Sequence, residues 1–208
     1  FIERQGASKK VRQTQGGISL RYAHGTEDVS QFVLYGIRRD LENPIPGRIV
    51  QLGRSAGGVR YVRSGRLHTL RYTAGIDAEW QRDQRDEFKN DGLPEGDVGQ
   101  MDDARIFDRI QYGERQLNQR ETVRNIGPFL SLDVPLNRWW TLSVSSRYDR
   151  YRLAADDRYL LDGDDSGVRS LGEFSPFIGV NFRPHPLLAL YANWATAFQT
   201  PTTVSYTH

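Results

Sequence analysis

Residues 68 to 81, HTLRYTAGIDAEWQ, alternate between two chemical characters without interruption. The even positions are mostly apolar, as at Leu70, Ile76 and Trp80, whereas no odd position carries an apolar side chain. Because successive side chains of a β-strand point to opposite faces, the pattern predicts a strand with one apolar and one polar face. Fourteen residues exceed the five or six of an ordinary strand, so the length itself needs a physical reason.

One tilted crossing of a lipid bilayer supplies that reason. The fourteen residues, at about 3.3 Å each, span about 46 Å, and a tilt near 45° projects this to about 33 Å. The hydrocarbon core of a membrane is roughly 30 Å thick. The sequence therefore predicts that the even positions, His68 to Trp80, face lipid and that the odd positions, Thr69 to Gln81, face an interior.

Two aromatic pairs fit the same interpretation. Tyr72 and Trp80 lie eight residues apart on the predicted lipid face, and Trp140 and Tyr148 repeat this spacing. Aromatic residues gather at both interfaces of transmembrane barrels, so each pair is expected to mark the two edges of an apolar band.

Alternation recurs along the chain and predicts about eight strands joined as antiparallel hairpins. Proline cannot donate to a ladder, so Pro128 and Pro176 are expected at strand starts or bulges, and SAGG at 55–58 as a further bulge. The predicted strands cover about residues 12–23, 31–39, 48–63, 68–81, 125–134, 140–149, 175–182 and 187–198.

The predicted connections alternate in length. Transmembrane barrels have short turns at one rim and long loops at the other, whereas a soluble sandwich needs no such segregation. Short turns are expected at 24–30, 63–66, 134–138 and 183–186, long loops at 82–118 and 155–172, and a further loop, ENPIPG, at 42–47.

Composition excludes several classes of protein. The mean hydropathy is −0.63, and no apolar run approaches the roughly 18 residues of a membrane-spanning helix. Twenty-eight basic and 26 acidic residues are interspersed and give a net charge of +2, which does not favour nucleic-acid binding. The absence of cysteine excludes disulfides and thiolate metal sites, and the four histidines form no i, i+4 pair. The start FIERQGASKK predicts an interior fragment or a processed chain.

Two stretches in the second half carry short motifs in a fixed order. NIGPFLSLDVPLNRWWTLSVSSRYD ends in Arg147, Tyr148 and Asp149, and SPFIGVNFRPHPLLALYANWATAFQTP closes with Phe198-x-x-Pro201. Together they resemble the C-terminal barrel of TonB-dependent outer-membrane receptors, most clearly over residues 121–201. Gln199 departs from the basic residue that many members carry before the proline.

The resemblance implies a fold and an activity. The fold is an all-β antiparallel transmembrane β-barrel, with about eight of 22 strands in residues 1–208 and the plug domain and C-terminal strands outside them. The activity is uptake of a scarce ligand, energised through TonB, without catalytic residues or a cofactor. The ligand would be a metal chelate such as a ferric siderophore, cobalamin or an oligosaccharide. The other implied partners are outer-membrane lipid and the TonB complex.

Two other interpretations stay open, because alternation is also typical of a half-buried antiparallel sheet. A small, complete eight-stranded outer-membrane barrel with a structural or adhesive role predicts pairing between about 12–23 and 187–198. A soluble β-sandwich binding module predicts a chain that stays monodisperse without detergent.

Candidate ligand-binding residues lie on the predicted interior face and in the first long loop. Charged groups on the interior face could contact a ligand or the plug, although polar barrel lumens also pair such charges across strands. Aromatic residues of the loop are suited to first capture. The candidates are Arg71, Asp77, Glu79, Arg147 and Asp149 on the face, and Phe88, Phe107 and Tyr112 in the loop.

The second long loop holds the densest group of carboxylates, in DGDDSG. Calcium favours several oxygen ligands on a flexible loop, which makes Asp162, Asp164 and Asp165 calcium candidates, although their spacing is not that of an EF-hand and a solvated loop is the alternative. DDSG also superficially resembles the nucleophile region of trypsin-like proteases. A nucleophilic serine needs a positioned base, and no histidine has that context, so no enzyme is predicted.

Overall fold

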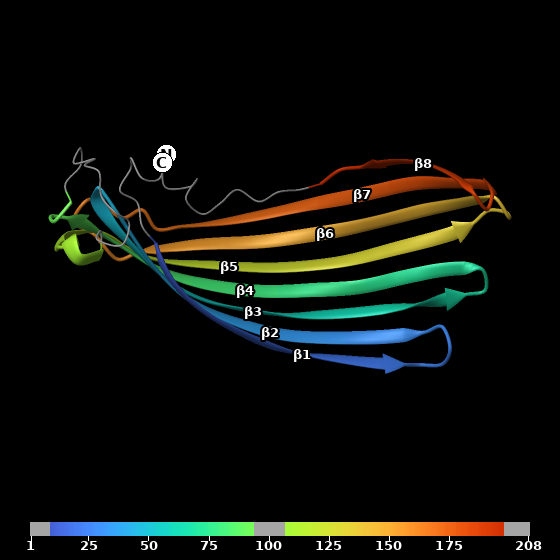
Figure 1. Ribbon diagram of the computed structural model, residues 1–208, viewed down its shortest axis with the longest axis horizontal. Coiled ribbons are helices and arrows are strands. Elements are labelled where there is room, and N and C mark those ends of the chain that lie inside the picture. The colour runs from blue at the N-terminus through green and yellow to red at the C-terminus, as the bar shows by residue number, and fades with distance from the viewer. Residues whose placement is uncertain (1–8, 94–106, 198–208) are drawn as a thin grey trace.

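A computed structural model describes residues 9–93 and 107–197. These residues form one antiparallel sheet in which all eight strands follow chain order, which confirms the predicted fold class (Figure 1). The strands are β1 (Lys10–Ala23), β2 (Val29–Ile45), β3 (Gly47–Leu67), β4 (Leu70–Asn90), β5 (Tyr112–Pro135), β6 (Trp140–Asp157), β7 (Gly167–His185) and β8 (Leu188–Ala195), and a 3-10 turn, η1 (Phe107–Arg109), precedes β5.

The sheet is open. Within the described residues β1 pairs only with β2 and β8 only with β7, so both are edge strands. The pairing of β1 with β8 that a complete eight-stranded barrel requires is therefore wrong for this part of the chain. A sandwich of two packed sheets is not formed either, because the described strands share one sheet.

The strands are longer than the hydropathy pattern predicts. β4 has 21 residues and β5 has 24, so the predicted loop at 82–118 is wrong over 82–90 and 112–118. The predicted loop at 155–172 likewise loses its two ends to β6 and β7. Apolar residues do not alternate regularly in these segments, which hides a strand from a pattern of hydropathy, but their backbone groups still pair with the neighbouring strands.

Two turns lie elsewhere than predicted. β3 continues through 63–66, and the turn falls at His68 and Thr69, where His68 has a φ of 56°. His68 therefore does not face lipid, and the apolar face of β4 begins at Leu70. The loop at 42–47 is also wrong, because only Pro46 separates β2 from β3, and Gly47 takes a φ of 79° that favours glycine.

The predicted bulges also move. SAGG pairs in unbroken register on both sides, and register shifts occur instead at Glu87 to Asn90 and at Phe182 to His185. Pro128 and Pro176 lie inside strands without a shift. The β5–β6 ladder is interrupted around Pro128, which has no N–H to donate.

One side of the sheet, here the apolar face, collects the large hydrophobic residues of neighbouring strands. Buried hydrophobic side chains are few in the described part: Ile49, Leu93 and Leu153. Instead, many large hydrophobic side chains that the register places together on the apolar face are more than a third exposed: Ile18, Leu20, Phe32, Leu34, Val59, Tyr61, Ile76, Ile126, Leu130, Val144, Ile178 and Leu190. Such a face suits lipid and lacks the cover of a globular core.

The two aromatic pairs lie on this face in the expected arrangement. Tyr72 is opposite Leu132, which is opposite Val144, and Trp140 lies four residues nearer the turn. Trp80 is opposite Arg124, which is opposite Arg152, and Tyr148 again lies four residues nearer the turn. From β4 to β6, the aromatic position therefore shifts by four residues in both pairs. Two parallel aromatic girdles on tilted strands require such an equal shift.

The connections separate into two ends of the sheet (Figure 1). The turns β1–β2, β3–β4, β5–β6 and β7–β8 lie at one end, here the short-turn end, and the other connections lie at the opposite, long-loop end. No helix in the described part of the chain is long and apolar enough to cross a membrane.

Candidate functional site

The face opposite the apolar face, here the polar face, centres on Arg147 of β6. Its Nε and Nη2 donate to the two carboxylate oxygens of Asp149 at 2.7 and 2.8 Å, and its Nη1 donates to Asp77 of β4 at 2.6 Å. The guanidinium thus forms two hydrogen bonds to one carboxylate and one hydrogen bond to another carboxylate. Such charge-assisted bonds are strong and directional. Arg147 therefore ties β6 to β4 across the intervening strand.

Gly127 of β5 makes this crossing possible. It lies directly opposite Asp77, and a Cβ there would overlap the Arg147 guanidinium and approach Asp149 Oδ1 to 2.6 Å. The absence of a side chain at Gly127 thus leaves the space in which the three charged groups meet.

Phe129 breaks the alternation of NIGPFLSLDV in β5, and its surroundings explain why. Its ring lies on the polar face with the guanidinium carbons of Arg60 and Arg147 at 5.5 and 5.9 Å from the centroid, within the range of a cation–π contact. Opposite it is Gly75, where a Cβ would lie 2.5 Å from the Phe129 ring. The aromatic ring supports the charged cluster instead of facing lipid.

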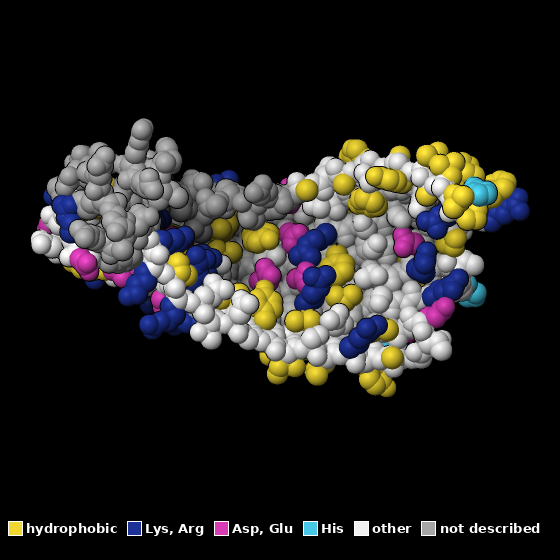
Figure 2. Space-filling model, viewed as in Figure 1, with side chains coloured by type: hydrophobic (Ala, Val, Ile, Leu, Met, Phe, Trp, Pro, Cys, Tyr) yellow, Lys and Arg dark blue, Asp and Glu magenta, His cyan; other side chains and the backbone are white. Residues whose placement is uncertain are grey.

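Further acidic residues of β4 on the polar face have partners too. Glu79 accepts a hydrogen bond of 2.8 Å from Tyr35, and Asp83, only 2% exposed, accepts two from Arg54 at 2.9 and 2.7 Å. Glu87 pairs with Arg48 at 3.0 Å. In the view of Figure 2, basic and acidic side chains accordingly lie next to one another across the middle of the molecule. Charge on this face is largely compensated within the sheet.

The structure joins three of the eight candidate ligand-binding residues directly: Asp77, Arg147 and Asp149. Glu79 lies on the same face of β4 and is bonded to Tyr35. Arg71 lies apart, near the short-turn end, in a hollow of about 540 Å³ that Asp133 also lines. Phe107 begins the 3-10 turn; its side chain lies outside the described part.

Phe88 and Tyr112 do not belong to a loop, which corrects their predicted position. They lie in β4 and β5, with ring centroids 5.3 Å apart. Phe88 shares its side of β4 with Gln84 and Asp86, on the side of the apolar face, so these rings do not join the cluster around Arg147.

Asp162, Asp164 and Asp165 lie between β6 and β7, and two of them take part in local turn contacts. Hydrogen bonds from the hydroxyl and the backbone N–H of Ser166 hold the pKa of Asp164 below its ordinary value, and the Asp165 N–H donates to Asp157. Among the described residues no group of three or more histidine or carboxylate side chains is placed to hold a metal ion. Calcium binding by this loop stays a prediction.

Sequence reasoning missed the paired residues beyond Gln81, because it assigned that stretch to a loop. Asp83 and Glu121 lie directly opposite each other, 2% and 5% exposed, and Arg54 lies opposite Asp83 on the other side. A signal was present: acidic residues continue at odd positions through Asp77, Glu79, Asp83 and Glu87, so the period of two persists in charge after it is lost in hydropathy.

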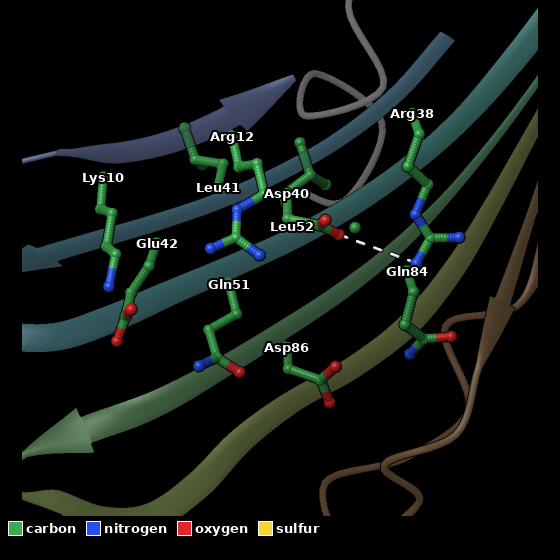
Figure 3. Close-up of a pocket in the computed structure, with 11 residues that line it drawn as sticks. Lys10, Arg12, Arg38, Asp40, Leu41, Glu42, Gln51, Leu52, Gln84 and Asp86 are labelled. Atoms are coloured by element: carbon green, nitrogen blue, oxygen red, sulfur yellow. Dashed lines mark ion pairs between the residues drawn. The ribbon is translucent and has the colours of Figure 1, made fainter. Parts of the chain in front are cut away.

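A second hollow, of about 470 Å³, lies at the long-loop end of β1 to β4 (Figure 3). Three basic and three acidic side chains line it: Lys10, Arg12, Arg38, Asp40, Glu42 and Asp86. Arg38 and Asp40 form an ion pair of 3.7 Å between exposed side chains. The mixture of signs is typical of a solvated polar surface and selects no ligand.

Substituting Gly127 by alanine tests the crossing of Arg147. The new Cβ would displace the guanidinium and break its contacts, so we expect the free energy of unfolding to fall by about 1–3 kcal/mol. The unfolding midpoint of the full-length protein in detergent measures this. Gly16→Ala is the matched control, since a Cβ at Gly16 meets nothing within 4 Å; equal effects of the two substitutions would contradict the assignment.

Comparison with known proteins agrees with the fold. The family model described as "TonB dependent receptor-like, beta-barrel" matches residues 3–207. The chain is similar to the copper transporter OprC (TM-score 0.73, 16% identity, 97% of this chain and 32% of that one). It is also similar to the siderophore receptor PiuA from Acinetobacter baumannii (TM-score 0.67, 11% identity, 92% of this chain and 34% of that one). A third similar structure is the unliganded ferric citrate transporter FecA (TM-score 0.66, 12% identity, 89% of this chain and 27% of that one).

The chain spans about a third of the length of these three proteins. Their low identity supports the fold, and the family assignment rests on the model that matches nearly all of the sequence. This is a family of outer-membrane receptors and transporters rather than of enzymes. An open sheet with one lipid-suited face and one face of paired charges, matched over residues 3–207, places the chain in the TonB-dependent receptor β-barrel family.

Proposed function

We propose that the chain forms part of the barrel wall of an outer-membrane receptor that takes up a scarce ligand by energised transport. The observation that carries the proposal is the division of one sheet into an exposed apolar face and a polar face whose charges pair across strands. A barrel that crosses lipid around a polar interior needs both properties. The similar solved structures are named as transporters or receptors of ferric citrate, copper and siderophores, which favours a metal chelate over cobalamin or an oligosaccharide.

The proposal fixes an orientation. Short turns face the periplasm in transmembrane barrels and longer loops face outward, so the short-turn end would lie inside and the long-loop end outside. The edge strands β1 and β8 would pair with further strands of the same barrel, because an unpaired edge is not tolerated in lipid. The plug domain and the contact with TonB would lie outside residues 1–208.

The polar-face candidates then divide into two roles. Asp77, Arg147 and Asp149 bind one another and hold the wall together. Arg71 and Glu79 are more exposed, which makes them the better candidates for contact with a ligand or with the plug.

An uptake assay tests this function. The full-length receptor is expressed in a strain that lacks its own chelate receptors, and accumulation of radiolabelled ferric siderophores, ferric citrate, copper, cobalamin and an oligosaccharide is measured. We expect at least one metal chelate to accumulate, and accumulation to fall to background when TonB is disrupted. Accumulation that does not depend on TonB, or a protein found outside the outer-membrane fraction, would contradict the proposal.

A further inference from the structure

Five arginines form a group on the apolar face, at its border toward the long-loop end. The register fixes their side of the sheet: Arg124 lies opposite Trp80 and Arg150 opposite Ile126, both residues of the apolar face. The arginine cluster consists of Arg82, Arg120, Arg124, Arg150 and Arg152, on β4, β5 and β6.

The cluster lacks the compensation found on the polar face. Among residues 9–93 and 107–197, no acidic side chain forms an ion pair with Arg82, Arg124, Arg150 or Arg152. The acid nearest in register, Asp156, lies opposite Arg120 but pairs with Arg158 at 2.9 Å. The Nε atom of Arg120 is buried without a hydrogen-bond partner in the described structure.

Two members of the cluster face each other directly. Arg124 and Arg152 are opposite partners in the β5–β6 ladder, and like charges in that position destabilise a sheet. Arg124, Arg150 and Arg152 are all exposed, so an anion can reach them. A bound anion would turn this repulsion into attraction.

The position of the cluster selects the anion. Trp80 and Tyr148 mark the edge of the apolar band, and the arginines lie beside or beyond them. In the proposed orientation this is the level of the headgroups of the outer leaflet. Guanidinium groups bind phosphate through paired hydrogen bonds, and their aliphatic stems can lie along apolar surface while the charge reaches the interface.

We propose that the arginine cluster binds the phosphate groups of phosphorylated lipids in the outer leaflet. The proposal rests on the membrane orientation given above but on neither a transported ligand nor TonB. The lipid would hold the outer wall at β4 to β6 in a fixed position relative to the bilayer.

Native mass spectrometry of the full-length protein in mild detergent tests the site. The probe is a bisphosphorylated lipid A, and the comparison lipid is the same molecule after removal of its phosphates. We expect the double variant R124Q/R152Q to bind the phosphorylated lipid at least about tenfold more weakly than the unaltered protein, because two charge-assisted contacts are lost. The variant R21Q/R183Q removes the same charge near the short-turn end and should bind within about twofold of the unaltered protein.

The single variant Arg150→Gln is measured as well, in case R124Q/R152Q does not fold. Heat-dependent mobility on gels shows whether each variant is folded. Equal binding by R124Q/R152Q and the unaltered protein, or equal binding of the dephosphorylated lipid, would overturn the proposal. Displacement of the lipid by an equimolar amount of inorganic phosphate would also overturn it, since free phosphate would then be the ligand. Because the measurement omits transported ligand and TonB, a negative result does not contradict the proposed uptake function. Likewise, a failed uptake assay does not contradict lipid binding by the arginine cluster.

Discussion

Replacing Arg147 by alanine is expected to lower the free energy of unfolding by about 3 kcal/mol. The side chain makes three charge-assisted hydrogen bonds, and its removal leaves Asp149, 8% exposed, and Asp77 without their main counter-charge. Removing one partner of a buried pair costs more than the pair contributes, because the remaining charge stays desolvated. The unfolding midpoint of the full-length protein, followed by heat-dependent gel mobility, measures the loss.

Two further variants separate charge from geometry. Arg147→Lys keeps the charge but cannot form the paired contact with Asp149, so we expect an intermediate loss. Arg21→Gln removes an exposed arginine from the polar face and should change stability by less than about 0.5 kcal/mol. If Arg147→Ala behaves like Arg21→Gln, the cluster does not hold the wall together.

Placing arginine at Ile76 is expected to destabilise the inserted barrel by about 2–4 kcal/mol, the cost of a basic side chain on the lipid face near the middle of a membrane. Ile76 is 38% exposed on the apolar face, and its strand neighbour Asp77 is turned to the polar face. Equilibrium folding into vesicles of a short-chain phosphatidylcholine measures the difference between Ile76→Arg and the unaltered protein.

Ser145→Arg is the control for this substitution. Ser145 lies in β6 opposite Ser131, on the polar face, where an added arginine can be hydrated. We expect it to cost less than about 1 kcal/mol. Equal costs at Ile76 and Ser145 would mean that the two faces of the sheet do not meet different solvents.

The facing of the strands could be predicted from the sequence because hydropathy alternates wherever one face meets lipid. From Leu70 to Trp80 the two sets of side chains lie on opposite sides of one unbroken ladder, as the alternation predicts. Hydropathy loses this information where apolar residues cease to alternate, which is why the pattern predicts a strand end at Gln81 although the ladder of β4 continues to Asn90. Backbone hydrogen bonds do not depend on side-chain polarity, so the strand has no reason to stop there.

The candidate site was predicted only in part for a similar reason. Charged residues at odd positions could be assigned to one face, which placed Asp77, Glu79, Arg147 and Asp149 on the same side of the sheet. Which charges pair depends on the register of three strands and on small residues such as Gly127 that leave space. Phe129 looks like an exception to alternation in the sequence, and its role becomes clear only when the neighbouring strand is known.

The length of β5 has a consequence for what the outside of a cell presents. Its 24 residues, at about 3.3 Å each and tilted near 45°, project to about 56 Å, some 25 Å more than the hydrocarbon core. In the proposed orientation, hydrogen-bonded β-sheet therefore extends above the lipid before any loop begins. Between the lipid and the loops, a protease or an antibody would therefore meet ordered sheet, which offers few cleavage sites and a rigid epitope.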